Sequence, residues 1–386
     1  MTAPTLAPNR SRAERTSSFD LAAFPPPTGR EEEWRFTALD RLGTLLEDHR
    51  VEPGADAHLD WQQDLPEGVG VSTLTPAEAI ELGVPAPQDR AAALAAAHSG
   101  GAMLVDVPRG ATPDRPVTIR LTGDPQEERP VHGHIVVRVG ALAEAIVVIE
   151  HSGSADHDQL LSVLVGEHAR LTVVSVQEWD DTARHLAQHD IVVGRDAEVR
   201  HVAVTLGGAV VRLNVNAVYA GPGGSFEALG LYFADEGQHL EHRLFVDHAV
   251  PNCRSNVIYK GALQGKDAHT VWVGDVLIRA EAEGTDTYEL NRNLVLTDGA
   301  RADSVPNLEI ETGQIVGAGH ASATGRFDDE QLFYLQSRGI PQDEARRMVV
   351  RAFFVELLQK IGVPELTERL EQAIDAELAT VEGDAR

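Results

Sequence analysis

Between residues 130 and 325 the chain is an almost continuous succession of short strand-like runs. The runs are five to eleven residues long, as in residues 134–140, 170–177, 198–206 and 210–220. Valine and other β-formers dominate them, turn residues separate them, and no long amphipathic helix interrupts them. A segment of this kind must build its core from strands alone, which leaves a β-solenoid or a β-sandwich.

Small residues at the turns favour the solenoid. Four corners carry Ala169, Ala197, Ser225 and Cys253, each 28 residues after the one before. A fixed period of strands is typical of stacked coils, because one coil cannot bury its apolar face alone and a small corner residue lets neighbouring coils approach. The repeat cannot be followed beyond residue 253. A β-sandwich, which also has short strands at regular spacing, stays an alternative.

The flanking regions differ in character. The chain divides into a disordered tail (1–15), an N-terminal helical and mixed region (16–125), a β-helix core (126–325) and a C-terminal helical domain (326–386). In the N-terminal region, leucines at helical intervals predict a helix within 30–48, an Ala-rich run predicts a helix within 85–98, and residues 102–108 and 116–123 read as strands.

Three helices are expected at the C-terminus. Asp328 can cap the first, which runs to Ser337, and Pro341 opens the second, which ends at Gly362. The third carries an apolar stripe from Leu366 to Leu378.

Charge and cysteine content exclude several classes of protein. With 33 basic and 60 acidic residues the formal charge is −27, which disfavours binding to nucleic acid or to an anionic membrane. No apolar run is long enough to span a bilayer. The single cysteine, Cys253, excludes an intrachain disulfide framework and an all-cysteine metal site from this chain alone, and it suits a reducing compartment.

The motifs of nucleotide hydrolysis and nucleophilic catalysis are not present in the sequence. The string nearest to a P-loop, Gly261–Asp267, has three residues between its glycines and Asp267 where a hydroxyl must bind magnesium. No G-x-S-x-G elbow occurs, and Cys253 lies in no nucleophile signature. We therefore expect no catalysis by this chain.

Histidine is the candidate metal ligand. Of the 16 histidines, most are expected to be solvated or hydrogen-bonded surface groups. His239, His242, His248 and Cys253 lie within fifteen residues, but His242 and His248 would be about 20 Å apart on one strand, too far to share an ion. His248 and Cys253 are weaker candidates. His320, in a small-residue run predicted to be a bend, would have an accessible imidazole suited to iron or zinc.

Several strings together resemble the SufB/SufD family of iron–sulfur cluster assembly proteins, and the SufD branch in particular. The matching strings are Glu33–Arg35, Phe245–His248, Cys253–Asn256, Tyr259–Gly261, Thr285–Asp286, Asn291–Leu296, Pro306–Ile310, the His320 run and Leu332–Ile340. The combination spans most of the chain.

The resemblance implies a right-handed parallel β-helix with helical regions at both ends. It also implies a cytoplasmic scaffold in which SufD pairs with SufB through the β-helix and its C-terminal helices dock the ATPase SufC. Tyr334 and Arg338 are then candidate SufC contacts, together with Leu332 and Phe333, for which packing on the core is the preferred interpretation.

In the family a histidine at the position of His320 faces SufB and is implicated in cluster formation. Iron or a cluster would be held there transiently and shared with SufB, with none bound stably by the isolated chain, which could also form a homodimer. Three positions depart from the family pattern: Ala318 and Ala321 replace a frequent cysteine and a frequent glycine, and Glu289 replaces a usual glutamine.

Two other functions stay open. A β-helix lyase or esterase acting on carbohydrate would need clustered carboxylates, often with calcium, in a groove. A SufB paralogue holding a cluster by itself is opposed by the solitary Cys253, which is expected to be a small core residue at a corner.

Overall fold

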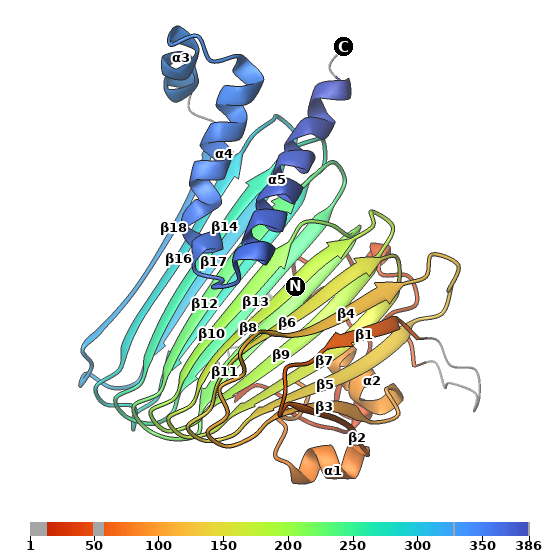
Figure 1. Ribbon diagram of the computed structural model, residues 1–386, viewed down its shortest axis with the longest axis vertical. Coiled ribbons are helices and arrows are strands. Elements are labelled where there is room, and N and C mark those ends of the chain that lie inside the picture. Colours follow the sequence, from red (N-terminus) through yellow and green to blue (C-terminus); the bar gives the residue numbers. More distant parts are fainter. Residues whose placement is uncertain (1–13, 49–57, 327–328, 385–386) are drawn as a thin grey trace, which may run out of the picture.

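A computed structural model describes residues 14–48, 58–326 and 329–384, and its centre is a β-solenoid built from two facing nine-stranded sheets (Figure 1). From β3 onward successive strands alternate between the sheets, so that neighbours within a sheet are two strands apart in the chain. The mainly β architecture and the parallel β-helix core are confirmed.

Within each sheet the strands lie side by side along the solenoid axis. From the N-terminal end, sheet A contains β1 (Asp60–Asp64), β4 (Val117–Gly123), β6 (Glu144–Gly153), β8 (Arg170–Trp179), β10 (Glu198–Thr205), β12 (Ser225–Ala234), β14 (Arg254–Leu263), β16 (Asp286–Val295) and β18 (Gly317–Arg326). From the same end, sheet B contains β2 (Gly70–Leu74), β3 (Ala102–Val107), β5 (Val131–Val139), β7 (Asp156–Val165), β9 (Arg184–Val193), β11 (Val210–Tyr219), β13 (His239–His248), β15 (His269–Ile278) and β17 (Arg301–Ile310).

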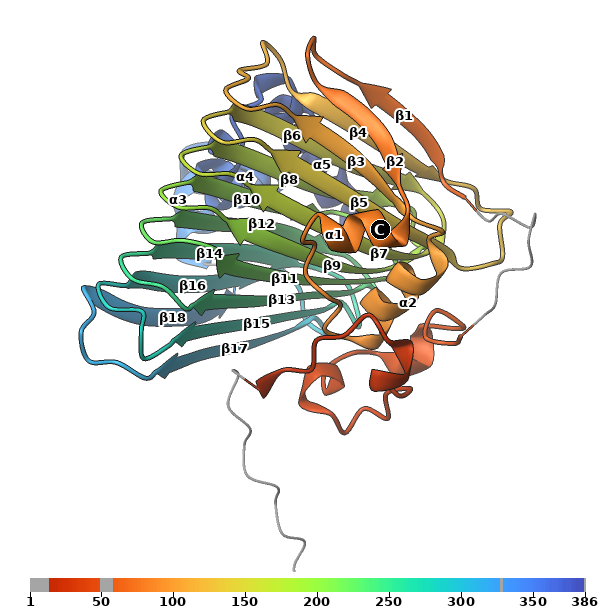
Figure 2. The same ribbon diagram turned by 90° about the horizontal axis from the view of Figure 1, so that it is seen from below.

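The two ends of the solenoid differ. At the N-terminal end the short strands β1 and β2 pair antiparallel with β4 and β3, whereas all other neighbours are parallel. At the opposite end β17 and β18 are ten-residue edge strands (Figure 2). Parallel pairing begins at β3, which lies before residue 126, the expected start of the β-helix core.

The corners explain both the period and its loss. Ala169, Ala197 and Cys253 are fully buried, and each follows a residue with positive φ. The third corner was predicted at Ser225, but Ser225 pairs with Glu198, so Gly224 is the corner residue and the intervals are 28, 27 and 29. The next corner, Thr285, comes 32 residues after Cys253 because a longer loop precedes it. This irregular spacing hides the repeat beyond residue 253.

Apolar side chains form two large clusters: one fills the space between the sheets, and the other covers the outer face of sheet A. Two C-terminal helices, α4 (Gln342–Gln359) and α5 (Pro364–Asp384), lie along that outer face (Figure 1). Their buried residues, including Phe354, Leu370 and Ile374, join one cluster with Val204 and Leu231 of the sheet. The predicted stripe on the last helix is therefore its packing face.

The N-terminal segment covers part of the outer face of sheet B (Figure 2). The prediction of a helix within 30–48 is wrong. After the 3-10 turn η2 (Leu21–Ala23), the chain forms two more short 3-10 turns there, η3 (Glu32–Trp34) and η4 (Leu39–Arg41). Trp34, Leu42 and Leu45 instead anchor these turns on Leu186 and Val210, so contacts with the sheet override the helical spacing.

The Ala-rich helix expected within 85–98 is α2 (Arg90–His98), capped by Asp89, and a shorter helix, α1 (Pro76–Glu81), precedes it. Residues 1–13 of the predicted tail lie outside the described residues. Arg15, predicted to belong to the disordered tail, is placed with its guanidinium 2.9 Å from the carboxylate of Asp275 and over the ring of Phe245.

The first C-terminal helix is α3 (Asp329–Ser337), and Asp328, its predicted cap, lies outside the described residues. In the described part of the chain, every helix is too short or too polar to cross a membrane.

Candidate functional site

His320 lies on the edge strand β18, and its side chain is exposed. The bend predicted at residues 317–323 is wrong, because these small residues pair along their whole length with β16. Glycine and alanine are weak strand formers, so the strand arises from the neighbouring ladder rather than from local preference. The predicted accessibility of the imidazole is confirmed.

The side of β18 that carries His320 faces the interior of the solenoid. Thr324 shares that side, and its hydroxyl lies 3.3 Å from the side-chain nitrogen of Asn293 on β16. In the parallel register His320 pairs with Glu289, and the residues of β16 on the same side as Glu289 are buried. His320 is exposed because β18 is the edge strand of its sheet.

Glu289 is a buried carboxyl group with no hydrogen-bond partner on either oxygen among the described residues. It is 1% exposed, and burial, followed by the nearby Asp275 carboxylate, raises the pKa of Glu289 to about 8. Its Oε1 lies 2.8 Å from the point that a Cβ atom on Gly274 of sheet B would occupy. The glycine therefore leaves the space into which the carboxyl group reaches.

A hydrogen-bonded polar network lies beside Glu289 at this end of the interior. Asn291 donates to the hydroxyl of Tyr232 (2.9 Å), that hydroxyl donates to Asn293 (2.7 Å), and Asn293 donates to Asn291 (2.8 Å). Ser304 of β17 donates to Asn291 (2.5 Å). The sequence interpretation missed this network, although the spacing of Asn291 and Asn293 by two residues, in step with Glu289, was a usable signal.

The expectation that most histidines are surface groups is wrong. Nine of the sixteen are buried: His134, His151, His157, His185, His189, His201, His239, His242 and His248. Burial lowers the pKa of His151 and His201 to about 4 and that of His242 to about 3, so these imidazoles are neutral at pH 7. They pair with one another and with neighbouring polar groups, as in the 2.9 Å contact between His189 and His201.

The two weaker candidates, His248 and Cys253, are both inside the molecule. His248 stacks on Tyr219 and its Nε2 lies 2.9 Å from the hydroxyl of Ser255, while burial lowers its pKa to about 4. The thiol of Cys253 lies beside the carbonyl of Gly221, and burial raises its pKa, which disfavours the thiolate that metals prefer. Across residues 14–48, 58–326 and 329–384, no three His, Cys, Asp or Glu side chains are grouped so that they could hold a metal ion.

Tyr334 and Arg338, the predicted partner-binding residues, are exposed on and just after α3. The Arg338 guanidinium lies over the ring of Tyr334 at 4.7 Å. Phe333 is 72% exposed, so the preferred interpretation that it packs on the core is wrong, whereas Leu332 is half-buried. Aromatic side chains are enriched at surfaces that bind another protein.

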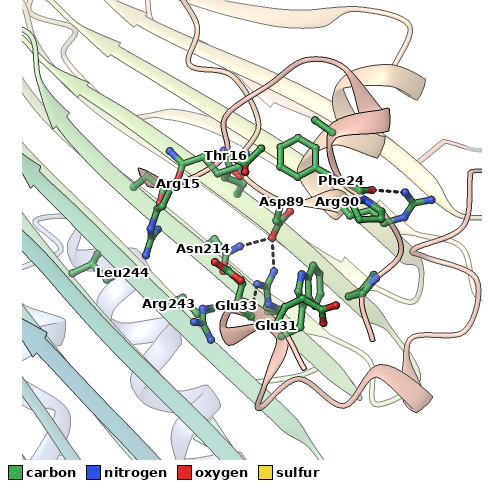
Figure 3. Close-up of a pocket in the computed structure, with 18 residues that line it drawn as sticks. Arg15, Thr16, Phe24, Glu31, Glu33, Asp89, Arg90, Asn214, Arg243 and Leu244 are labelled. Carbon is green, nitrogen blue, oxygen red and sulfur yellow. Dashed lines mark hydrogen bonds and ion pairs between the residues drawn. The ribbon is translucent and has the colours of Figure 1, made fainter. Parts of the chain in front are cut away.

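A pocket of about 270 Å³ lies where the N-terminal segment crosses sheet B (Figure 3). The guanidinium of Arg212 lies 2.6 Å from Asp89, over the ring of Trp34 at 4.0 Å, and donates to the carbonyl of Glu33. Part of the Glu33–Arg35 string thus fastens the segment to β11. The fully buried Glu241 likewise lies 3.2 Å from Arg243. Since these charges are paired within the chain, we assign the pocket a structural role.

Comparison with known proteins agrees with this architecture. Residues 121–353 match the family model for the SufBD core domain of SUF system FeS cluster assembly. An iron–sulfur cluster assembly SufBD family protein of Mycobacterium tuberculosis is 53% identical over 399 residues, covering 99% of this chain and 98% of the relative. One from Mycobacterium leprae is 53% identical over 372 residues, with 95% and 94% covered. The iron–sulfur cluster assembly protein SufD of Escherichia coli is 28% identical over 267 residues, with 67% and 62% covered. With its solenoid matched along this length, the chain belongs to the SufBD family of iron–sulfur cluster assembly proteins.

Proposed function

We propose that this chain is the SufD-type subunit of a cytoplasmic SufB–SufC–SufD scaffold, on which iron–sulfur clusters are assembled. It pairs with a SufB-like chain through the β17–β18 end, and its C-terminal helices bind a SufC-type ATPase. It does not itself catalyse a covalent reaction. Iron or a nascent cluster is held transiently at the joint between the two β-helices, near His320.

The observation that carries this proposal is the β18 edge. Its ten residues are small and uncharged apart from His320 and Arg326, and from Ser322 to Arg326 they are exposed. Edge strands usually carry charges or proline that prevent pairing with another chain, and β17 has Pro306, but β18 has neither along most of its length. An exposed ladder with an accessible imidazole suits a site completed by a second chain.

The exposed side chains of α3 support the second contact. Phe333 and Tyr334 are 72% and 56% exposed, while the neighbouring helices α4 and α5 use their own apolar face to pack on the solenoid. We assign ATP hydrolysis to a separate chain, which agrees with the failure of Gly261–Asp267 to match the P-loop pattern.

Co-purification of the tagged chain from its own host, with mass spectrometry of its partners, tests the assembly. We expect a SufB-like chain and an ABC-type ATPase. Recovery of the stable chain alone would refute the scaffold proposal. It would favour the alternative of a carbohydrate-active β-helix enzyme, which assays on polyuronides would test directly.

The His320 role needs a separate experiment. We expect His320→Ala to lower the cluster yield of the reconstituted complex without dissociating it. An unchanged yield would refute the role in cluster formation, and loss of the complex would show that His320 acts in packing between the chains.

A further inference from the structure

Two side chains of kinds that can ligate metals, one carboxyl and one imidazole, start from adjacent points at the C-terminal end of the solenoid. Glu289 on β16 and His320 on β18 are paired in the parallel register and point to the interior side of sheet A. Neighbouring strands are about 4.8 Å apart, so the two side chains leave the sheet close together and on the same side. Figure 2 shows this end of the ladder, where β16 and β18 lie side by side.

Glu289 is unusual because nothing in the described chain satisfies it. Both carboxyl oxygens are buried and without a hydrogen-bond partner. An isolated buried carboxylate is strongly unfavourable unless a cation or a donor compensates it. The neighbouring Asp275 cannot do so, because it is itself acidic and is already bonded to Arg15 and Asn307. The site therefore holds an unsatisfied acid, which a cation can compensate when it displaces the carboxyl proton.

His320 supplies the complementary ligand. Its side chain is exposed, and a neutral imidazole nitrogen and a carboxylate oxygen are together well suited to divalent first-row metals such as iron, whereas calcium and magnesium prefer oxygen ligands alone. Two side chains are fewer than a stable site needs, which agrees with the lack of any three-residue metal group in the described residues. The remaining positions are left to water or to a second chain.

We propose that Glu289 and His320 together bind a ferrous ion at the open end of the solenoid, as this chain's half of a site that a partner completes. This inference rests on the proposed function, in which His320 receives iron, and it adds a second ligand that the sequence pattern alone treats as a departure. Glu289 supplies the charge that His320 lacks, so the pair holds a cation where either group alone would not.

Anaerobic titration of the full-length chain with Fe(II), and with Co(II) as a spectroscopic probe, tests the pair. We expect weak binding of one ion, with Co(II) absorption bands that report a nitrogen and oxygen ligand set. Glu289→Gln keeps the size of the side chain and removes the carboxyl group that can lose its proton to a metal ion, and it should weaken binding at least tenfold. His320→Ala should do the same. His168→Ala, which removes an exposed histidine from a distant corner, is the matched control and should change nothing. Thermal melts exclude misfolding of any variant.

The outcomes separate this inference from the proposed function. If Glu289→Gln binds as tightly as the unmodified chain while His320→Ala does not, the carboxylate ligand is refuted and the role of His320 survives. If the unmodified chain binds neither ion, the titration is repeated on the co-purified complex. A Glu289-dependent site there supports the inference, and none there overturns it. Recovery of the SufB and SufC partners is decided independently of any metal.

Discussion

Replacing Arg212 tests whether the N-terminal segment is fastened by a buried charge cluster. The side chain is 1% exposed and lies 2.6 Å from Asp89 and 3.4 Å from Glu241, with the Trp34 ring stacked on it. Arg212→Ala removes the cation that the two buried carboxylates share. Breaking a buried ion pair in this way lowers the free energy of unfolding by about 3–5 kcal/mol. Since total stabilities are about 5–15 kcal/mol, the loss is large enough for equilibrium urea unfolding followed by circular dichroism.

Two further variants make the test specific. Arg212→Lys keeps the charge but loses the planar fork that reaches two carboxylates and stacks on Trp34, so it should recover less than half of the loss. Arg301→Ala removes an arginine whose side chain is 66% exposed and lies 2.8 Å from Asp303, and it should cost under about 1 kcal/mol. The reasoning is refuted if Arg212→Ala costs no more than Arg301→Ala, or if lysine restores full stability.

Three other changes probe the packing of the solenoid. A methyl group on Gly261 would overlap the buried ring of Tyr232, so Gly261→Ala should lose about 1–3 kcal/mol in urea unfolding, whereas Gly70→Ala, with no atom within 4 Å of the added carbon, should be near neutral. Burial lowers the pKa of His201 to about 4, below the usual value of 6.5, so the unfolded chain takes the proton first and stability is lost as the pH falls from 6.5 towards 4. His201→Gln should remove about 2 kcal/mol of the loss between pH 7 and pH 5, and an unchanged pH dependence would contradict the assignment. Phe354→Ala, between α4 and sheet A, should cost about 3–5 kcal/mol in the same assay; a cost near zero would mean that α4 does not depend on this contact.

Strand-rich segments were predictable because short runs of β-branched and other apolar residues favour strands whatever their neighbours are. Residues 130–310 read as strands since valines and leucines fill both the interior and, under α4 and α5, the outer face. The corners at Ala169 and Ala197 were predictable for a different reason: close stacking of the coils admits only small residues there. Gly224 was missed by one residue because its coil is one residue shorter.

The candidate site was harder to predict because it depends on long-range pairing. His320 was selected from its small-residue run and then from the resemblance, but its strand consists mostly of Gly, Ala, Ser and Thr and forms only because β16 offers a ladder. The buried histidines were misjudged because a period of two residues shows which side chains share a face, but not whether that face is lined with polar partners. The room for the buried carboxyl group of Glu289 depends on Gly274 across the interior, a contact that no local pattern contains.

The unequal ends of the solenoid limit how many copies can be joined by strand addition. β1 and β2 are five residues long and run against the ladder, while β17 and β18 are ten residues long and continue its direction. A partner that adds strands therefore finds a full-length template at one end alone. If chains join by strand addition, we expect the assembly to stop at a pair, because joining two such ends uses both full-length templates and leaves none from which a fibre could grow.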